Sequence, residues 1–181
     1  MHNNFNSIAL TTILSFMGSL ALAQNSEIEI LTPNGKTEFC VNQPITLVAR
    51  TINVATDDIV SLNWDGDMTI VEKDLGDILI LRPQKKGNYT FTVSLNDKAG
   101  NKISETVTIK VKPVIKPILK IKNNSIIIDL EENAPSCTFS YFINNQQVNE
   151  DEFKKAEQAG KYFVITTTDG CSALSNTIEM P

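Results

Sequence analysis

Apolar and polar residues alternate with a period of two along much of this chain. The clearest example is residues 88–96, where apolar side chains at every second position are separated by Asn, Thr and Ser. Because successive side chains of a strand point to opposite faces, this pattern predicts an antiparallel strand that is buried on one face. Residues 107–111 repeat the pattern and predict a second such strand.

Other short runs of the same kind are separated by turn-forming clusters such as Pro33-Asn34-Gly35 and Lys86-Gly87-Asn88. The predicted strands before residue 88 are 27–31, 45–52, 59–64, 68–72 and 77–81. Seven short strands within about 85 residues are typical of a β-sandwich. The first half of the chain is therefore predicted to be one sandwich.

Two prolines, Pro113 and Pro117, interrupt the alternation. Proline opposes a central strand and stiffens a connector, so residues 113–116 are predicted to link a domain of residues 24–112 to a smaller one of residues 117–181. The strands predicted in the smaller domain are 118–122, 125–130, 137–143, 161–168 and 173–180.

A short helix is predicted between the last two long strands of the smaller domain. Asn149 can cap it, with Glu152 as the capping-box partner three residues on, and Gly160 would end it after residues 155–158. An irregular crossover loop is the alternative for the same residues.

The two halves of the chain resemble each other. Gly87-Asn88-Tyr89 opens one strand and Gly160-Lys161-Tyr162 opens another, and each strand runs into a turn with Asp and Gly. This indicates a weak internal repeat whose second copy is shortened. The predicted fold class is all-β, with two immunoglobulin-like sandwich modules in tandem and one short helix in the second.

Two runs, 78–81 and 126–128, are apolar at every position. Each could be a strand that is covered on both faces, or an edge strand that accepts a strand from a partner. Central burial is the favoured interpretation for both.

The N-terminus predicts export. An apolar run from Ile8 to Leu22 ends in Ala21-Leu22-Ala23, the small-residue pattern of a signal-peptidase site, so residues 1–23 are predicted to be a cleaved signal peptide. A membrane anchor is the alternative, but about 15 apolar residues fall short of the roughly 20 that span a bilayer. The mature chain is expected to be soluble in the periplasm, on the outer membrane or outside the cell.

Composition limits the chemistry of the mature chain. Its formal net charge is −5 and it has no basic cluster, which argues against nucleic acid as a partner. The only histidine, His2, lies in the predicted signal peptide, so a Ser-His-Asp or Cys-His arrangement is excluded and zinc loses its usual nitrogen ligand. No cofactor-binding fingerprint is present. The chain is therefore predicted not to be an enzyme.

Four acidic residues could gather at one end of the first sandwich: Asp57, Asp58, Asp65 and Asp67. Carboxylates and loop carbonyls bind calcium, and a pair of carboxylates can hydrolyse glycosides. The favoured interpretation is simpler, because Asp is common in turns, where its side chain bonds the local backbone. Calcium is the alternative ligand that these four residues allow.

Three cysteines remain after the signal peptide. We predict a disulfide between Cys137 and Cys171, both in the smaller domain, whose marginal core a loop closure of about 35 residues would stabilise by roughly 3–4 kcal/mol. Two free thiols or another pairing are the alternatives. Cys40 is then the odd thiol, expected to be buried and inert within Phe39-Cys40-Val41, with a bond to another chain as its alternative.

Trp64 shares a strand face with Leu62. An exposed tryptophan could stack on a sugar ring, which would make the module carbohydrate-binding. A lone tryptophan at this place in a sandwich more often fills the core, and this is the favoured interpretation.

Three motifs carry a resemblance to known modules. Residues 62–67, 87–93 and 96–101 make the stretch 45–111 resemble a polycystic-kidney-disease-type or related immunoglobulin-like module. Residues 160–176, with a Gly-x-Tyr strand before an Asp-Gly-Cys turn, resemble repeats of exported Bacteroidota proteins. The resemblance implies a surface or periplasmic module for adhesion, glycan attachment, or type IX secretion and gliding.

Together these observations predict a non-catalytic exported protein that binds or scaffolds an envelope or surface protein, as an accessory subunit of a cell-envelope or secretion assembly. A carbohydrate-binding or adhesion module is the alternative function.

Overall fold

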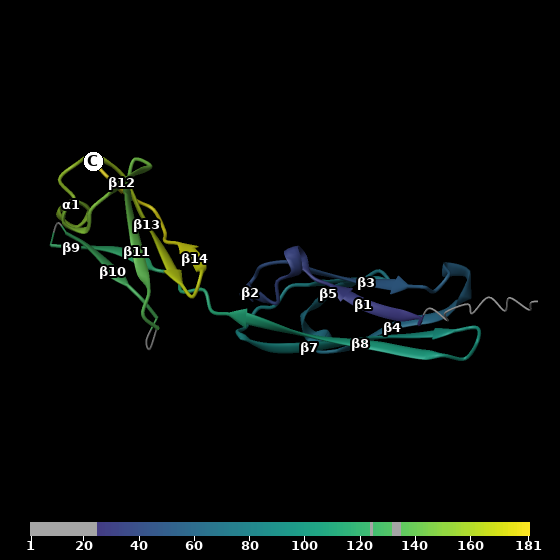
Figure 1. Cartoon of the computed structure of the whole chain (residues 1–181). Helices are drawn as coiled ribbons and strands as arrows, with labels where there is room; N and C mark the ends of the chain where they lie inside the picture. Colours follow the sequence, from purple (N-terminus) through teal and green to yellow (C-terminus); the bar gives the residue numbers. More distant parts are fainter. Residues whose placement is uncertain (1–24, 124, 132–134) are drawn as a thin grey trace, which may run out of the picture.

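The computed structural model describes residues 25–123, 125–131 and 135–181. Nearly all of its regular structure is β-strand, in two bodies that a short segment after residue 112 connects (Figure 1). No helix among the described residues is long and apolar enough to cross a membrane.

The N-terminal sandwich consists of two four-stranded sheets. One has the order β1 (Glu27–Leu31), β3 (Ile45–Ile52), β6 (Ile78–Leu81) and β5 (Val71–Asp74). The other has the order β2 (Glu38–Cys40), β8 (Lys102–Lys112), β7 (Gly87–Asp97) and β4 (Ile59–Gly66). All pairs are antiparallel except the pair of β2 and β8, which is parallel. Three 3-10 turns connect strands at Pro33–Gly35, Thr56–Asp58 and Met68–Ile70.

Alternate side chains of these strands point between the sheets and form the core of the N-terminal sandwich. Fully buried examples are Leu47, Leu79, Phe91 and Ile109, one from each of β3, β6, β7 and β8. The order of the strands is that of immunoglobulin domains, in which strands A, B, E and D face strands C, F and G. The N-terminal sandwich therefore has the immunoglobulin-like fold.

Two aromatic residues occupy the places that they have in immunoglobulin-like domains. Trp64 on β4 is buried, and its indole N–H donates a hydrogen bond to the Gly76 carbonyl at 2.8 Å. Tyr89, near the start of β7, donates from its hydroxyl to the Lys85 carbonyl at 2.8 Å. A buried tryptophan on strand C and a tyrosine corner at strand F are hallmarks of this fold.

The C-terminal sandwich is unequal. Its small sheet contains only β9 (Ile118–Lys122) and β10 (Ser125–Asp129). Its large sheet has the order β12 (Gln146–Val148), β11 (Thr138–Ile143), β13 (Gly160–Thr168) and β14 (Cys171–Leu174), and β15 (Ile178–Met180) also pairs with β13. The residues that are buried together between the sheets are Leu119, Ile126, Ile143, Phe153, Tyr162 and Val164.

The short helix α1 (Glu150–Lys155) lies between β12 and β13 in the sequence and packs against β10 and β11. The prediction that Asn149 caps it is confirmed, because the Asn149 side chain accepts a hydrogen bond from the Glu152 N–H at 2.8 Å. The helix ends earlier than predicted, at Ala156, which adopts the left-handed conformation. Phe153 anchors α1 in the core and is fully buried.

Most strands lie where the alternation predicts them, but two predictions were wrong. In the predicted strand 68–72, Met68–Ile70 form a 3-10 turn and β5 begins only at Val71, since the Asp67 side chain accepts from the Thr69 N–H and caps the turn. The predicted strand 173–180 is two strands, β14 and β15, because the chain turns away at Asn176, whose side chain bonds β9.

The two runs that are apolar on both faces differ in their surroundings. β6 lies between β3 and β5, so its predicted central position is confirmed. β10 has one described neighbour, β9, so its predicted central position was wrong. The side chain of Ile127, at the middle of β10, is 40% exposed.

Candidate binding site

An open groove lies on the C-terminal sandwich between β10, β11 and α1. Its volume is about 620 Å³. The residues that line it are Ser125, Ile126, Ile127 and Ile128 of β10, Phe139 and Tyr141 of β11, and Glu150 and Lys154 of α1. We call this feature the β10 groove.

The floor of the β10 groove is aromatic. Phe139 and Tyr141 are two residues apart on β11, so their side chains share the inward face, and their ring centroids are 6.1 Å apart. The Tyr141 ring also lies 5.2 Å from the buried ring of Phe153 on α1. Because both β11 rings are only half-buried, the floor offers apolar contact area to a ligand.

One wall of the β10 groove carries paired charges. Lys154 and Glu150, one helical turn apart on α1, form an ion pair. The hydrogen bond from Lys154 lowers the pKa of the Glu150 carboxyl below its ordinary value. Burial, and next the negative charge of Glu150, raise the pKa of the Tyr141 hydroxyl. The Tyr141 hydroxyl therefore keeps its proton at neutral pH, with the Glu150 carboxylate as the acceptor beside it.

The other wall is the free edge of a strand. The Leu119 N–H donates to Asn176 Oδ1 at 2.7 Å, and the Leu119 carbonyl accepts from Asn176 Nδ2 at 3.1 Å, so both groups point away from β10. Leu119 pairs with Ile128. In an antiparallel ladder, hydrogen-bonded and non-hydrogen-bonded pairs alternate, so the N–H and carbonyl groups of Ile128 and Ile126 point away from β9 into the groove. Neither residue bonds another described residue there.

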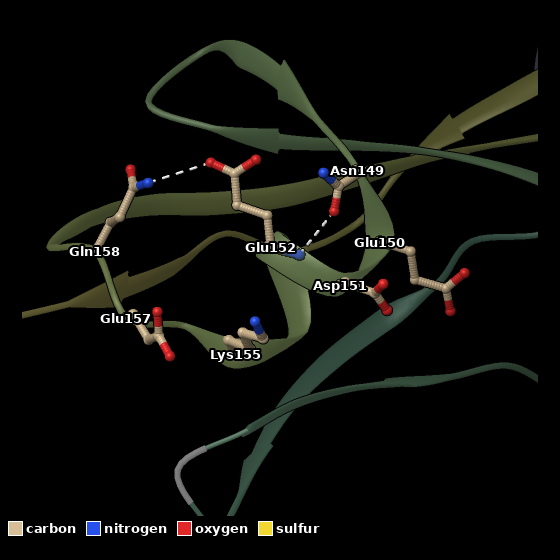
Figure 2. A pocket seen from close by; sticks show the side chains of 7 residues that line it. All are labelled: Asn149, Glu150, Asp151, Glu152, Lys155, Glu157 and Gln158. Atoms are coloured by element: carbon tan, nitrogen blue, oxygen red, sulfur yellow. Dashed lines mark hydrogen bonds between the residues drawn. The ribbon is translucent and has the colours of Figure 1, made fainter.

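A second hollow, formed by α1 and the residues that follow it, is acidic (Figure 2). Its residues are Asn149, Glu150, Asp151, Glu152, Lys155, Glu157 and Gln158. Figure 2 shows that the carboxylates diverge: Glu152 points toward Gln158, whose amide donates to it at 3.2 Å, whereas Glu150 and Glu157 point away from each other. A cation site needs convergent oxygens, and this arrangement does not supply them.

The junction between the sandwiches is covalent. Cys40 at the end of β2 and Cys171 at the start of β14 form a disulfide with a Cα–Cα distance of 5.7 Å. Lys112, at the end of β8, makes an ion pair with Glu38 at 2.5 Å and donates to the Asp169 carbonyl at 3.1 Å. The hydrogen bonds from the two lysines Lys112 and Lys110 lower the pKa of Glu38.

The predicted disulfide between Cys137 and Cys171 was therefore wrong. The ladder pairs Thr168 of β13 with Cys171 on one side, and its continuation on the other side places Cys137 beside the same threonine. Cys137 and Cys171 are thus two strand spacings apart, about 10 Å, which exceeds the roughly 7 Å that a disulfide can bridge. Cys137 is a free, partly buried thiol, and the expectation that Cys40 is an unpaired buried thiol was wrong as well.

The four aspartates do not form the single site that the sequence allowed. Asp57 and Asp58 precede β4, whereas Asp65 and Asp67 lie at its other end, so the whole strand, about 23 Å long, separates the pairs. Each later aspartate bonds its own turn: Asp65 accepts from the Gly66 N–H and Asp67 from the Thr69 N–H. Within the described residues, no three potential ligands gather for a metal ion.

The expected core position of Trp64 is confirmed. Its side chain is 7% exposed, and its only polar atom bonds the Gly76 carbonyl, so it offers no face to a sugar ring. An aromatic pair that was not predicted lies on the outer face of the large sheet, where Phe142 and Phe163 stack with ring centroids 4.9 Å apart. The unbroken apolar run 162–165 is the sequence signal that could have predicted this pair.

No protein-family model matches the sequence, and no curated protein matches it. Solved structures with a similar backbone fold include murine CEACAM1b. Its sequence is 13% identical, the match covers 86% of this chain and 99% of that chain, and the TM-score is 0.42. The fibronectin(III)-like modules of Clostridium thermocellum CbhA are 15% identical over 83% of this chain and 90% of theirs, with a TM-score of 0.43.

A third similar structure is SGBP-B of the Bacteroides ovatus mixed-linkage glucan utilization locus, solved in complex with a mixed-linkage heptasaccharide. It is 14% identical, covers 87% of this chain and 48% of that chain, and has a TM-score of 0.37. At these identities and scores the likeness says nothing of function. The assignment of the fold rests on the order of the strands and on the positions of Trp64 and Tyr89.

Proposed function

We propose that this chain is an exported, non-catalytic protein that holds two immunoglobulin-like modules in a fixed arrangement and binds a protein of the cell envelope. The observation that carries the proposal is the covalent junction between Cys40 and Cys171. Disulfides persist in oxidising compartments, which agrees with export. A cross-link between two modules restricts their relative motion, a property that suits a scaffold.

The chemistry of the hollows supports binding without catalysis. The β10 groove offers aromatic rings, a strand edge and an ion pair, which are binding groups. Residues 25–181 contain no histidine, and Asp65 and Asp67 bond their own turns. The proposed activity requires no cofactor.

The resemblance of residues 160–176 to repeats of exported Bacteroidota proteins supports a finer proposal. We infer that the partner belongs to a surface or secretion assembly, such as that of type IX secretion or gliding, in which this chain is an accessory subunit. Carbohydrate binding, the alternative function, loses its candidate residue because Trp64 is buried.

The test is affinity capture with the folded chain. The wild-type chain and the double variant Cys40→Ala/Cys171→Ala are immobilised and exposed to detergent-solubilised envelope from the native cell, with Cys137→Ala as the matched control. The expected result is one envelope protein that the wild type and the control retain and that the double variant binds at least tenfold more weakly. Equal retention by all three chains, or turnover of a substrate by the purified chain, would contradict the proposal.

A further inference from the structure

Three strands of the C-terminal sandwich correspond in order and pairing to three strands of the N-terminal sandwich. In the N-terminal sandwich, β3 is followed by β4, which pairs with β7, and the tyrosine corner lies at the start of β7. In the C-terminal sandwich, β10 is followed by β11, which pairs with β13, and Tyr162 of β13 donates from its hydroxyl to the Gln158 carbonyl at 2.7 Å. β10 therefore corresponds to β3, β11 to β4 and β13 to β7.

The segments between these matched strands differ. The N-terminal sandwich places β5 and β6 there, and β6 pairs antiparallel with β3. The C-terminal sandwich has β12, which pairs with β11 in the large sheet, and α1. No described strand takes the place of β6, so the edge of β10 that faces the groove is the edge that β6 covers on β3.

We propose that the β10 groove receives one extended apolar strand from another protein, which completes the small sheet as β6 completes its counterpart. This inference rests on the proposed function and names the chemistry of the partner. The backbone N–H and carbonyl groups of Ile126 and Ile128, which point into the groove, would bond the backbone of the incoming strand. Phe139 and Tyr141 would contact its alternate side chains. Such strand addition combines main-chain hydrogen bonds with pockets for every second residue.

The strand β6 shows what chemistry fits. Leu79 and Leu81 point into the core and are fully buried, and Ile78 and Ile80 on the other face are half-buried. The occupant should therefore be four to five residues of extended chain (the length of β6 and β10) with apolar side chains at least at alternate positions.

The edge strands β5, β1 and β9 carry protections that natural proteins use against unwanted pairing. β5 is charged at three of its four positions and contains a register shift, and β1 has two glutamates. The outer edge of β9 is capped by the Asn176 amide. β10 has three consecutive isoleucines and no register shift, and on its groove side only the short helix α1 lies near its edge.

The walls of the groove favour a single strand over a second copy of the chain. α1 and β11 flank the edge of β10, and an added strand needs only the usual interstrand spacing of about 4.8 Å. A whole sandwich would have to bring its own sheet and α1 into the same space. The occupant is therefore a separate extended segment.

The probe for the test is a fluorescein-labelled peptide of residues 77–86 of this chain, which contains the β6 sequence between charged ends. It is titrated against the full mature chain with its disulfide intact, and binding is followed by fluorescence anisotropy. The same peptide with Leu79→Asp and Leu81→Asp is the negative probe. Hydrogen exchange of the bound and free chain shows which amides the peptide protects.

Two proline variants form a matched pair. Ile128→Pro removes an N–H that points into the groove, whereas Ile121→Pro removes one that points from β9 to the opposite edge, so neither breaks the ladder between β9 and β10. The expected result is at least a tenfold loss of peptide affinity in Ile128→Pro and less than a twofold change in Ile121→Pro. The exposed substitution Ile127→Lys, which places a charge on the edge without touching the core, should also weaken binding if Ile128→Pro fails to fold.

Protection of the Ile126 and Ile128 amides on peptide binding supports the inference. Equal affinity of the two proline variants, protection elsewhere, or a dimer of the chain that Ile128→Pro dissociates would overturn it. A wild-type chain that ignores the peptide but still captures its envelope protein contradicts this inference alone. A chain that binds the peptide in the groove but captures no envelope protein contradicts the proposed function instead.

Discussion

Loss of the bond between Cys40 and Cys171 should destabilise the C-terminal sandwich far more than loss of the third thiol. The double variant Cys40→Ala/Cys171→Ala removes the cross-link without leaving a hydroxyl in the buried site of Cys171. Cys137→Ala is the matched control, since Cys137 is a free thiol in the same sandwich.

The size of the destabilisation follows from the length of the loop that the disulfide closes when the C-terminal sandwich is unfolded. β2 pairs with β8 so that Cys40 lies beside Lys112. While the N-terminal sandwich stays folded, the disulfide therefore closes a loop that runs from Lys112 to Cys171, about 60 residues, and not the whole separation of 131. Chain entropy assigns such a loop about 4 kcal/mol of stabilisation. For so small a sandwich this corresponds to a shift of the melting temperature on the order of 20 °C.

The assay is thermal and urea unfolding followed by far-UV circular dichroism, with fluorescence of Trp64 to report on the N-terminal sandwich alone. Reduction of the wild type, or the double substitution, should lower the free energy of unfolding of the C-terminal sandwich by about 4 kcal/mol. The fluorescence of Trp64 should not change in this transition. Cys137→Ala should change the free energy of unfolding by less than about 1 kcal/mol. Equal stability of the double variant and the wild type would refute the reasoning, because it would mean that the disulfide constrains no unfolded loop.

Three further predictions concern single residues. Gly66→Ala should cost more than about 2 kcal/mol in a urea melt, because the added Cβ would overlap a backbone carbonyl of β7, whereas Gly76→Ala, also at positive φ but in open space, should cost about 1 kcal/mol. Tyr162→Phe should cost about 1–2 kcal/mol in the same assay, because the Gln158 carbonyl loses its donor. The pKa of Glu38 is lowered in the fold, so its contribution to stability is present above its ordinary pKa of 4.5 and is lost as the pH falls below it. The stability difference between wild type and Glu38→Gln should accordingly disappear in acid melts.

Alternation of side chains was sufficient to predict the long strands. β1, β3 and β9 begin and end where the sequence pattern places them. In β3, Ile45, Leu47 and Ala49 are buried on one face, and a slip of one residue would expose them. The short strands β2 and β12 escaped prediction. Three residues are too few to show a period, and both strands owe their existence to a neighbour, β8 and β11 respectively, that offers a free edge.

The cysteine pairing could not be read from the sequence for a related reason. Cys137 and Cys171 belong to one domain and are closer to each other in the sequence than either is to Cys40. Cys137 precedes β11 and Cys171 begins β14, however, and β13 lies between these two strands. Cys40 reaches Cys171 only because β2 runs parallel to β8 and ends at the junction. The β10 groove could not be predicted for the same reason. The apolar run 126–128 predicted a strand, but its position at the edge of a sheet depends on strand pairing, which no local pattern encodes.

The open edge of β10 and the disulfide should be linked through the stability of the C-terminal sandwich. A two-stranded sheet buries little apolar area, so this sandwich depends on the cross-link more than the N-terminal one does. A strand that binds the native groove and not the unfolded chain stabilises it by mass action, by about 2.7 kcal/mol at a hundred times its Kd. The peptide of residues 77–86 should therefore restore more than half of the roughly 4 kcal/mol of unfolding free energy that Cys40→Ala/Cys171→Ala removes. The measurement is the urea midpoint of the double variant with and without peptide, and the Ile128→Pro substitution should abolish the gain. A midpoint that the peptide leaves unchanged, in a chain shown to bind it, would mean that the strand docks outside the sheet.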